Sequence, residues 1–300
     1  MSIKTVAIAG ANGVLGRPVL EELLRQGYAV TILSRPHSSS TYPDNVKVAA
    51  TDFKDKASIV EALEGQDAFI STIGSGSGMD AVLLAEAAVE AGVKRYIPSE
   101  FGSDTKNHEI RSLPFYAPKL AAQAKLEELT AAPDSKTTWT YVYSSAFLEY
   151  SFQLPIIANL KQRQITLWDG GNVEYTATSI PAVATATVNV LKNLEATQNR
   201  PVRISSIMLS QRKVLAAAQE AIGSDGWTVT EKTTISAKEE SLAIMRTEPT
   251  KFKAWIMGFL SRALFAKEAG GNFAGSKDNE LLGTPQVSND ELVEIIRKCA

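Results

Sequence analysis

The stretch Gly10-Ala11-Asn12-Gly13-Val14-Leu15-Gly16 decides the fold of this chain, because it joins an apolar run at residues 5–9 to an amphipathic helical pattern. At such a strand-to-helix turn, the first glycine permits a tight reversal and the second lets the backbone approach a pyrophosphate. The third lets the helix pack against the strand. The phosphates then meet the positive helix N-terminus. The pattern predicts a dinucleotide-binding turn, and we expect the following residues to bind a cofactor: Gly10, Asn12, Gly13, Val14, Leu15 and Gly16.

The first 150 residues alternate short apolar runs with longer segments of helical periodicity, which is typical of βαβ units. The expected strands cover residues 5–9, 29–33, 46–49, 68–71, 95–98 and 138–143. The expected helices cover residues 14–26, 56–63, 79–91 and 119–131. This order predicts an α/β protein with a Rossmann-type, doubly wound parallel sheet.

The regularity fades after Phe147, where aromatic-rich segments and a turn at residues 168–172 follow. Helices are expected at residues 211–221 and 290–298, and a strand at 202–205 is expected to return to the main sheet. We therefore divide the chain into an NAD(P)-binding Rossmann domain at residues 1–150 and a smaller C-terminal substrate-binding lobe at residues 151–300. The boundary is soft because strands of the second half can join the first.

Composition narrows the classes of partner. The chain has 31 basic and 33 acidic residues without a long run of either sign, which argues against nucleic acid or an anionic membrane surface. Cys299 is the only cysteine and there are two histidines, so neither an intramolecular disulfide nor a metal site is expected. Without a window of eighteen apolar residues, we expect a cytoplasmic chain with a small-molecule partner, as a monomer or a homodimer.

The end of the second expected strand indicates which nicotinamide cofactor fits. A carboxylate there accepts hydrogen bonds from the adenosine ribose, whereas a basic residue accommodates a 2′-phosphate. The chain has Ser34 and Arg35 at this point and offers no acid. NADPH is therefore the expected cofactor, with Arg35 on its 2′-phosphate; an exposed loop charge is the alternative interpretation of Arg35.

Further cofactor contacts are expected where the third and fourth strands end. Asp52 and Phe53 follow the third strand, near the expected adenine, although a core phenylalanine beside a turn aspartate explains them equally well. Ser71, Thr72, Ile73 and Gly74 end the fourth strand, where the chain should pass the pyrophosphate and the nicotinamide ribose. Gly74 leaves room for close backbone approach.

With these residues in view, the chain resembles the NmrA-like and isoflavone reductase-like group of atypical short-chain dehydrogenases. The resemblance rests on the glycine turn, on Arg35, and on segments at residues 91–102, 141–147 and 278–283. The most specific segment is Pro98-Ser99-Glu100-Phe101-Gly102. The resemblance implies that cofactor-lining residues also come from these segments, namely Ser99, Glu100, Phe101, Ser145 and Phe147.

The same resemblance implies a catalytic lysine early in the helix after that segment, and Lys119 matches it best. Lys119 is also expected to contact the cofactor. The stretch that follows lacks the basic cluster of the family's reductases, so Lys125 is the reserve candidate. Hydride transfer leaves negative charge on oxygen, and a lysine can supply a proton or a fixed positive charge there. An exposed helix lysine is the alternative interpretation.

Aromatic residues supply the candidate substrate pocket. Tyr116 lies three residues before Lys119, so the Tyr-x-x-x-Lys pair of ordinary short-chain dehydrogenases is absent, and a wall of the pocket is the expected role. If the second lobe covers the strand ends, the pocket would be lined by Tyr116, Phe147, Tyr150, Phe152 and Trp168. Core packing explains any one of them as well.

The family includes reductases of plant phenylpropanoids and regulators that bind dinucleotide without turnover. We therefore expect an NADPH-dependent oxidoreductase that transfers hydride to an aromatic or conjugated small molecule. Two alternatives stay open: a redox sensor that binds NADP(H) without turnover, and a non-redox isomerase or cyclase on the same fold.

Overall fold

The side chains of β1 (Thr5–Ala9) alternate between two hydrophobic cores. Val6 and Ile8 pack into one core, and Ala7 and Ala9 pack into the other. This period of two places β1 inside a sheet that is covered on both faces. The structure is a computed structural model that describes residues 2–74, 80–154, 156–276 and 278–300.

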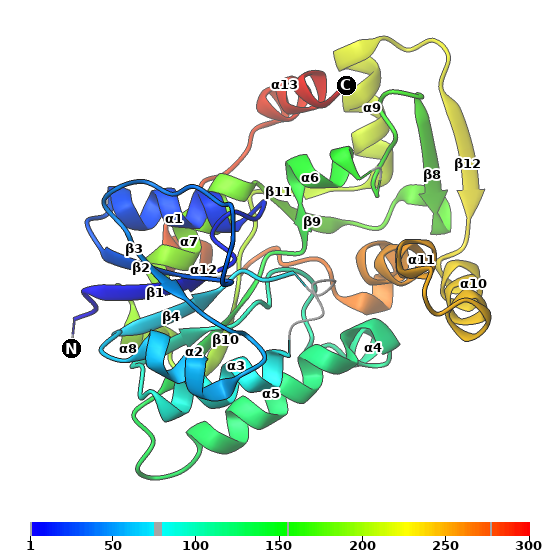
Figure 1. Ribbon diagram of the computed structural model, residues 1–300. Helices are drawn as coiled ribbons and strands as arrows, with labels where there is room; N and C mark the ends of the chain where they lie inside the picture. The colour runs from blue at the N-terminus through cyan, green and yellow to red at the C-terminus, as the bar shows by residue number, and fades with distance from the viewer. Residues whose placement is uncertain (1, 75–79, 155, 277) are drawn as a thin grey trace.

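The central sheet has seven strands in the order β10-β6-β5-β4-β1-β2-β3 (Figure 1). All of its pairings are parallel. The other strands are β2 (Ala29–Ser34), β3 (Lys47–Ala50), β4 (Ala68–Ser71), β5 (Arg95–Ile97), β6 (Thr138–Tyr143) and β10 (Arg200–Arg203). The predicted Rossmann-type, doubly wound sheet is confirmed. The strand order reverses at β1, between β2 and β4, which opens a crevice at the carboxyl ends of these strands.

Helices cover both faces of the sheet (Figure 1). One face carries α1 (Gly16–Arg25), α7 (Ile180–Val190) and α12 (Asp278–Leu282), and α7 contacts both of the others. The opposite face carries α2 (Lys56–Leu63), α3 (Ala81–Glu90) and α5 (Ala117–Thr130). The predicted helices at 14–26, 56–63 and 119–131 are confirmed within a few residues at each end. The helix predicted at 79–91 is observed over Ala81–Glu90, and Met79 lies outside the described residues.

The C-terminal half returns to the main sheet, as predicted. The strand expected at residues 202–205 is observed as β10, which pairs in parallel with β6. Arg95 of β5 links β6 to the segment that precedes β10. Its buried guanidinium donates to the hydroxyls of Thr140 and Thr197 and to the carbonyl oxygen of Leu194. The last two residues belong to α8 (Leu194–Thr197), which precedes β10.

The rest of the C-terminal half forms a smaller lobe with its own core. A three-stranded sheet in the order β11-β9-β7 comes first, and a two-stranded ribbon pairs β12 with β8. These strands are β7 (Ala146–Phe147), β8 (Gln164–Trp168), β9 (Tyr175–Thr178), β11 (Ile207–Leu209) and β12 (Thr228–Lys232). The helices packed in this lobe are α6 (Leu148–Gln153), α9 (Gln211–Ile222) and α13 (Asn289–Cys299).

A helical hairpin of α10 (Thr234–Thr247) and α11 (Phe252–Phe265) extends from the lobe to the carboxyl ends of the central strands (Figure 1). Arg262 of α11 anchors the hairpin, because its Nε donates to Glu109 at 2.9 Å and its Nη1 donates to Thr234 at 2.9 Å. Glu109 belongs to α4 (His108–Arg111), which precedes α5. This contact holds α11 beside the N-terminus of α5. Within the described residues, none of the helices has both the length and the apolar character of a membrane span.

Candidate active site

The glycine turn after β1 is shaped by three different constraints. Gly10 has a φ of 84°, a conformation that favours glycine, and its carbonyl oxygen accepts a 2.9 Å hydrogen bond from the Gly13 N–H. A Cβ on Gly16 would lie 2.0 Å from the Gly10 oxygen, so only glycine lets α1 start this close to β1. A Cβ on Gly13 would meet the same oxygen at 3.2 Å and face open space beyond it. The backbone at Gly13 is therefore exposed to a ligand.

A groove with a volume of about 870 Å³ opens above this turn. The sequence-predicted cofactor residues that line it are Gly10, Asn12, Gly13, Ser34, Arg35, Asp52, Phe53, Thr72, Ile73 and Gly74. No described side chain caps the N-terminus of α1, which begins beside the groove. Unpaired N–H groups and the helix dipole favour an anion at this point. The groove therefore fits an extended molecule that carries phosphates at its centre.

The charged residues of the groove favour a phosphate at its β2 end. Arg35 is exposed there, and Lys54 lines the same groove. The two acids nearby have local roles: Asp80 accepts from the N–H groups of Val82 and Leu83 at the start of α3, and Asp52 accepts from the Lys54 N–H at 3.0 Å. Two cations, Arg35 and Lys54, thus line the groove.

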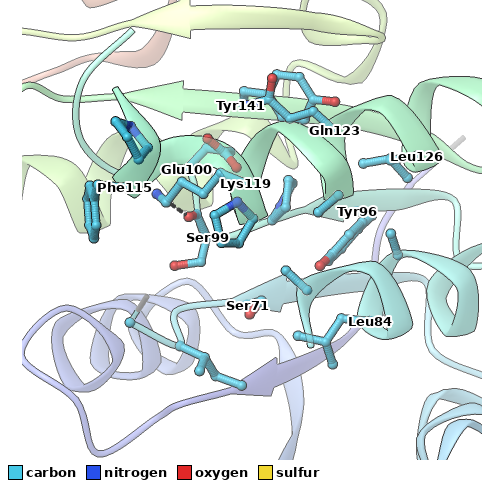
Figure 2. Close-up of a pocket in the computed structure, with 18 of the residues that line it drawn as sticks. Ser71, Leu84, Tyr96, Ser99, Glu100, Phe115, Lys119, Gln123, Leu126 and Tyr141 are labelled. Atoms are coloured by element: carbon cyan, nitrogen blue, oxygen red, sulfur yellow. Dashed lines mark hydrogen bonds between the residues drawn. The ribbon is translucent and has the colours of Figure 1, made fainter. Parts of the chain in front are cut away.

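A second cavity of about 180 Å³ lies between α3 and α5, and it shares Ile73 and Gly74 with the groove (Figure 2). Of the predicted cofactor residues, Ser71, Ser99, Glu100 and Lys119 line this cavity rather than the groove. Tyr96, Leu84 and Leu126 supply apolar surface. The shared residues place this inner cavity next to the groove.

Lys119 occupies the third position of α5, directly after Pro118 in the first turn, as its sequence predicts. Its Nζ donates a 2.7 Å hydrogen bond to the Ser99 carbonyl oxygen (Figure 2). Lys119 also lines a third cavity, of about 190 Å³, on the other side of its side chain. The ammonium group therefore lies between two cavities, at a position that can supply positive charge or a proton to either.

The third cavity collects residues from distant parts of the chain. The predicted residues that line it are Phe101, Tyr116, Lys119, Ser145, Phe147 and Tyr150, and Leu260 and Leu264 of α11 close it. The Tyr116 hydroxyl donates to Ser103 Oγ at 2.9 Å, and burial raises the pKa of Tyr116 to about 12. Ser145 has a φ of 54°, an unusual conformation for a buried non-glycine residue.

Other predicted site residues lie elsewhere. Leu15 is buried in the core that α1 shares with α7, and Val14 is 47% exposed. Phe152 is buried in the core of the C-terminal lobe. Trp168 lines a separate cavity of about 510 Å³ between the β8/β12 ribbon and the α10/α11 hairpin. The structure thus brings Tyr116, Phe147 and Tyr150 together, and it does not bring Phe152 and Trp168 to them.

Lys125, the reserve candidate, lies on the outer side of α5. Its Nζ pairs with Glu128 at 3.3 Å, and it lines neither of the cavities that contain Lys119.

Several residues at the site escaped the sequence reasoning. Phe115, Phe252 and Trp255 lie at the inner cavity, although Phe252 and Trp255 come from α11, more than a hundred residues after Lys119. The spacing of Phe252, Trp255 and Phe259 would have predicted one apolar face of a helix, but not which cavity that face covers. Gln123 also lines the inner cavity, one helical turn after Lys119.

Comparison with known proteins places this site in a family. The family model described as "NmrA-like family" matches residues 2–238. Oxidoreductase aprR of Aspergillus flavus is 30% identical over 304 residues, which cover 99% of this chain and 100% of that protein. Phenylcoumaran benzylic ether reductase PT1 of Pinus taeda is 26% identical over 287 residues, with 89% of each chain covered.

Solved structures show the same fold at lower sequence identity. AtPrR2 with NADP+ and (+)pinoresinol superposes with a TM-score of 0.78 at 18% identity, covering 100% of this chain and 99% of that chain. The binary complex of leucoanthocyanidin reductase and NADPH from Vitis vinifera superposes with a TM-score of 0.76 at 17% identity, covering 97% of this chain and 99% of that chain.

The family match covers most of the chain, and the relative from Aspergillus flavus is 30% identical over nearly all of it. The chain belongs to the NmrA-like family.

Proposed function

We propose that this chain is an NADPH-dependent reductase that transfers hydride to an aromatic or conjugated small molecule. The observation that carries the proposal is that the groove and the two cavities lie next to one another. The groove above the glycine turn shares Ile73 and Gly74 with the inner cavity, and Lys119 borders both that cavity and the aromatic third cavity. A dinucleotide in the groove can therefore extend its nicotinamide end toward Lys119.

The groove residues bind the cofactor in this account. The Gly13 backbone and the N-terminus of α1 meet the pyrophosphate, and Arg35 and Lys54 meet the 2′-phosphate. When bound, the reduced nicotinamide supplies the hydride. The cofactor-bound complexes among the solved structures and the names of the curated relatives support NADPH and the reductase class.

Lys119 is the protein residue that assists the reduction in this proposal. As hydride reaches the substrate, negative charge develops on an oxygen, and the Lys119 ammonium stabilises that charge and donates a proton to it. The hydrogen bond to Ser99 holds the Lys119 Nζ in place before the substrate arrives. A positioned donor of this kind lowers the barrier without reorganising during the reaction.

The third cavity is the proposed substrate site. Tyr116, Phe147 and Tyr150 line it with aromatic surface, which suits a flat ring. The name of one relative, phenylcoumaran benzylic ether reductase PT1, and the (+)pinoresinol in the AtPrR2 structure support an aromatic substrate class. Cytoplasmic residence and a monomeric or homodimeric state stay predictions from the sequence.

The test is NADPH oxidation, followed by its absorbance, against a panel of flavonoids, lignans, quinones and imines. We expect at least one member to be reduced with consumption of NADPH. A Gly13→Val chain in the same assay controls for oxidation that does not depend on the groove. If NADPH binds by calorimetry but no member of the panel oxidises it, the redox-sensor alternative is favoured and the reductase proposal fails.

A further inference from the structure

The carboxyl group of Glu100 is buried beside Lys119. Glu100 directly follows Ser99 in the sequence. The Ser99 carbonyl oxygen accepts the hydrogen bond from Lys119 Nζ. Glu100 is 3% exposed, and its Oε2 has no hydrogen-bond partner among the described residues. Figure 2 shows Glu100 and Lys119 among the side chains that line the inner cavity, and Gln123 and Tyr141 line it too. A buried acid without a fixed partner is costly and calls for an explanation.

Six titratable side chains interact electrostatically with Glu100. The titratable side chains that act on it, or on which its charge acts, are Tyr96, Lys106, Tyr116, Lys119, Tyr141 and Tyr143. Burial raises the pKa of all four tyrosines, so they stay neutral. Burial also raises the pKa of Glu100, and the charges of Lys119 and Lys106 and the Gln123 amide only partly oppose this effect.

The Gln123 side chain carries hydrogen-bonding groups that suit either protonation state of Glu100. Its amide acts to lower the pKa of Glu100, and its Nε2 donates to Thr105 Oγ1 at 2.6 Å. The Gln123 Oε1 is buried without a partner among the described residues. An ionised carboxylate needs a donor and a neutral acid needs an acceptor, and a side-chain amide carries both. Glu100 and Gln123 line the same cavity, so the amide offers a donor and an acceptor on the wall that holds the carboxyl group.

We propose that Glu100 is a positioning residue that must carry its proton for Lys119 to support reduction. With Glu100 neutral, the full charge of the Lys119 ammonium faces the developing negative charge on the substrate oxygen. An ionised Glu100 offsets that charge and holds the ammonium proton more tightly. During turnover, the proton moves from Lys119 to the substrate oxygen and then returns to Lys119 from solvent, while Glu100 keeps its own proton. The inference rests on the proposed reductase function.

The first test is the pH dependence of kcat over about pH 5 to 9, in the parent and in Glu100→Gln. We expect kcat of the parent to fall by about tenfold to a hundredfold as Glu100 ionises, the effect of one charge at close range. Glutamine cannot ionise, so this fall should disappear in Glu100→Gln, whereas Glu100→Asp should keep it. The matched control is Glu128→Gln on the same helix, where the carboxylate is exposed and the fall should persist.

A purely structural role gives a different result. It would scale kcat of Glu100→Gln by one factor at every pH and leave the shape of the profile parental, which would overturn the proposal. A parent profile without any fall over this range would also overturn it.

The second test measures thermal unfolding and needs no substrate. Because the pKa of Glu100 is higher in the folded chain than its ordinary value of 4.5, the folded state holds this proton to higher pH than the unfolded state does. The parent should therefore lose stability relative to Glu100→Gln as pH rises above 4.5. A constant difference between their melting temperatures would contradict the proposal, even if no substrate is found and the proposed function itself fails.

Discussion

The Lys119 ammonium donates a 2.7 Å hydrogen bond to the Ser99 carbonyl oxygen, and this bond holds the lysine between two cavities. Ser99 lies just beyond the carboxyl end of β5, and Lys119 lies in the first turn of α5. The contact joins the end of the central sheet, where dinucleotides bind, to the helix that borders the aromatic cavity. The proposed cofactor site and the proposed substrate site meet at this contact.

At the glycine turn, one substitution should impair cofactor binding and another should impair stability. Gly13→Val should fold, because the nearest atoms to a Cβ there are the Gly10 oxygen at 3.2 Å and the Gly16 nitrogen at 4.0 Å. It should lose affinity for NADPH because the branched side chain occupies the phosphate position. Gly16→Val should lose stability instead, since its Cβ would lie 2.0 Å from the same oxygen. Thermal unfolding and calorimetric titration of both variants check this. Parental NADPH affinity in Gly13→Val would place the phosphates elsewhere.

Arg35 is predicted to determine the choice between NADPH and NADH. A charge-assisted hydrogen bond to the 2′-phosphate is worth about 1.5 to 3 kcal/mol, so Arg35→Ala should reduce the preference for NADPH by about tenfold to a hundredfold. Affinity for NADH should change little. The control is Arg25→Ala, at the far end of α1, where the arginine pairs with Glu22. Calorimetry with both cofactors measures the ratio, and an unchanged ratio in Arg35→Ala would contradict this role.

The fold could be predicted from the sequence because its signals are local. The turn between residues 10 and 16 and the apolar runs at 5–9, 68–71 and 138–143 fix the strands, and the structure reproduces those bounds. The C-terminal half was predicted less completely. Its two-stranded ribbon and the α10/α11 hairpin depend on packing between segments far apart in the chain, and a periodic pattern does not reveal such packing.

The residues of the candidate site also divide into those that local sequence signals predict and those that depend on long-range packing. The groove residues follow strand ends, and parallel topology brings strand ends together, so ten of the predicted cofactor residues line one groove. Residue type alone assigns Trp168 to the candidate substrate pocket. The structure places it in another cavity because β8 pairs with β12. Gln123 is one helical turn from Lys119, a spacing the sequence shows, but its relation to Glu100 requires the packing of α5 on β5.

Asp67 should make the stability of the chain depend on acid pH. Burial by itself raises its pKa, but hydrogen bonds from Lys94 Nζ and from the N–H groups of Lys4 and Thr5 outweigh burial and lower the pKa to about 2. The folded pKa is depressed, so the stabilisation is present above 3.8 and is lost as pH falls toward 2. After allowance for solvent screening, we expect about 1 to 2 kcal/mol.

The measurement for Asp67 is the unfolding free energy of the parent and of Asp67→Asn over this acid range. The parent should be more stable at neutral pH, and the two curves should converge as the carboxylate is protonated. A difference that does not depend on pH would show that the carboxylate charge is not the source of the stabilisation.

Steady-state turnover of Lys119→Ala with an accepted aromatic substrate tests the proposed role of Lys119 most directly. Lys125→Ala, which removes a lysine of the same helix that pairs with Glu128, is the matched control. We predict that Lys119→Ala keeps nearly parental NADPH affinity while kcat falls by about a hundredfold to ten-thousandfold, the usual contribution of a positioned proton donor. Lys125→Ala should keep parental kcat. Parental kcat in Lys119→Ala would contradict the account and would return the chain to the alternatives of a redox sensor or a non-redox enzyme.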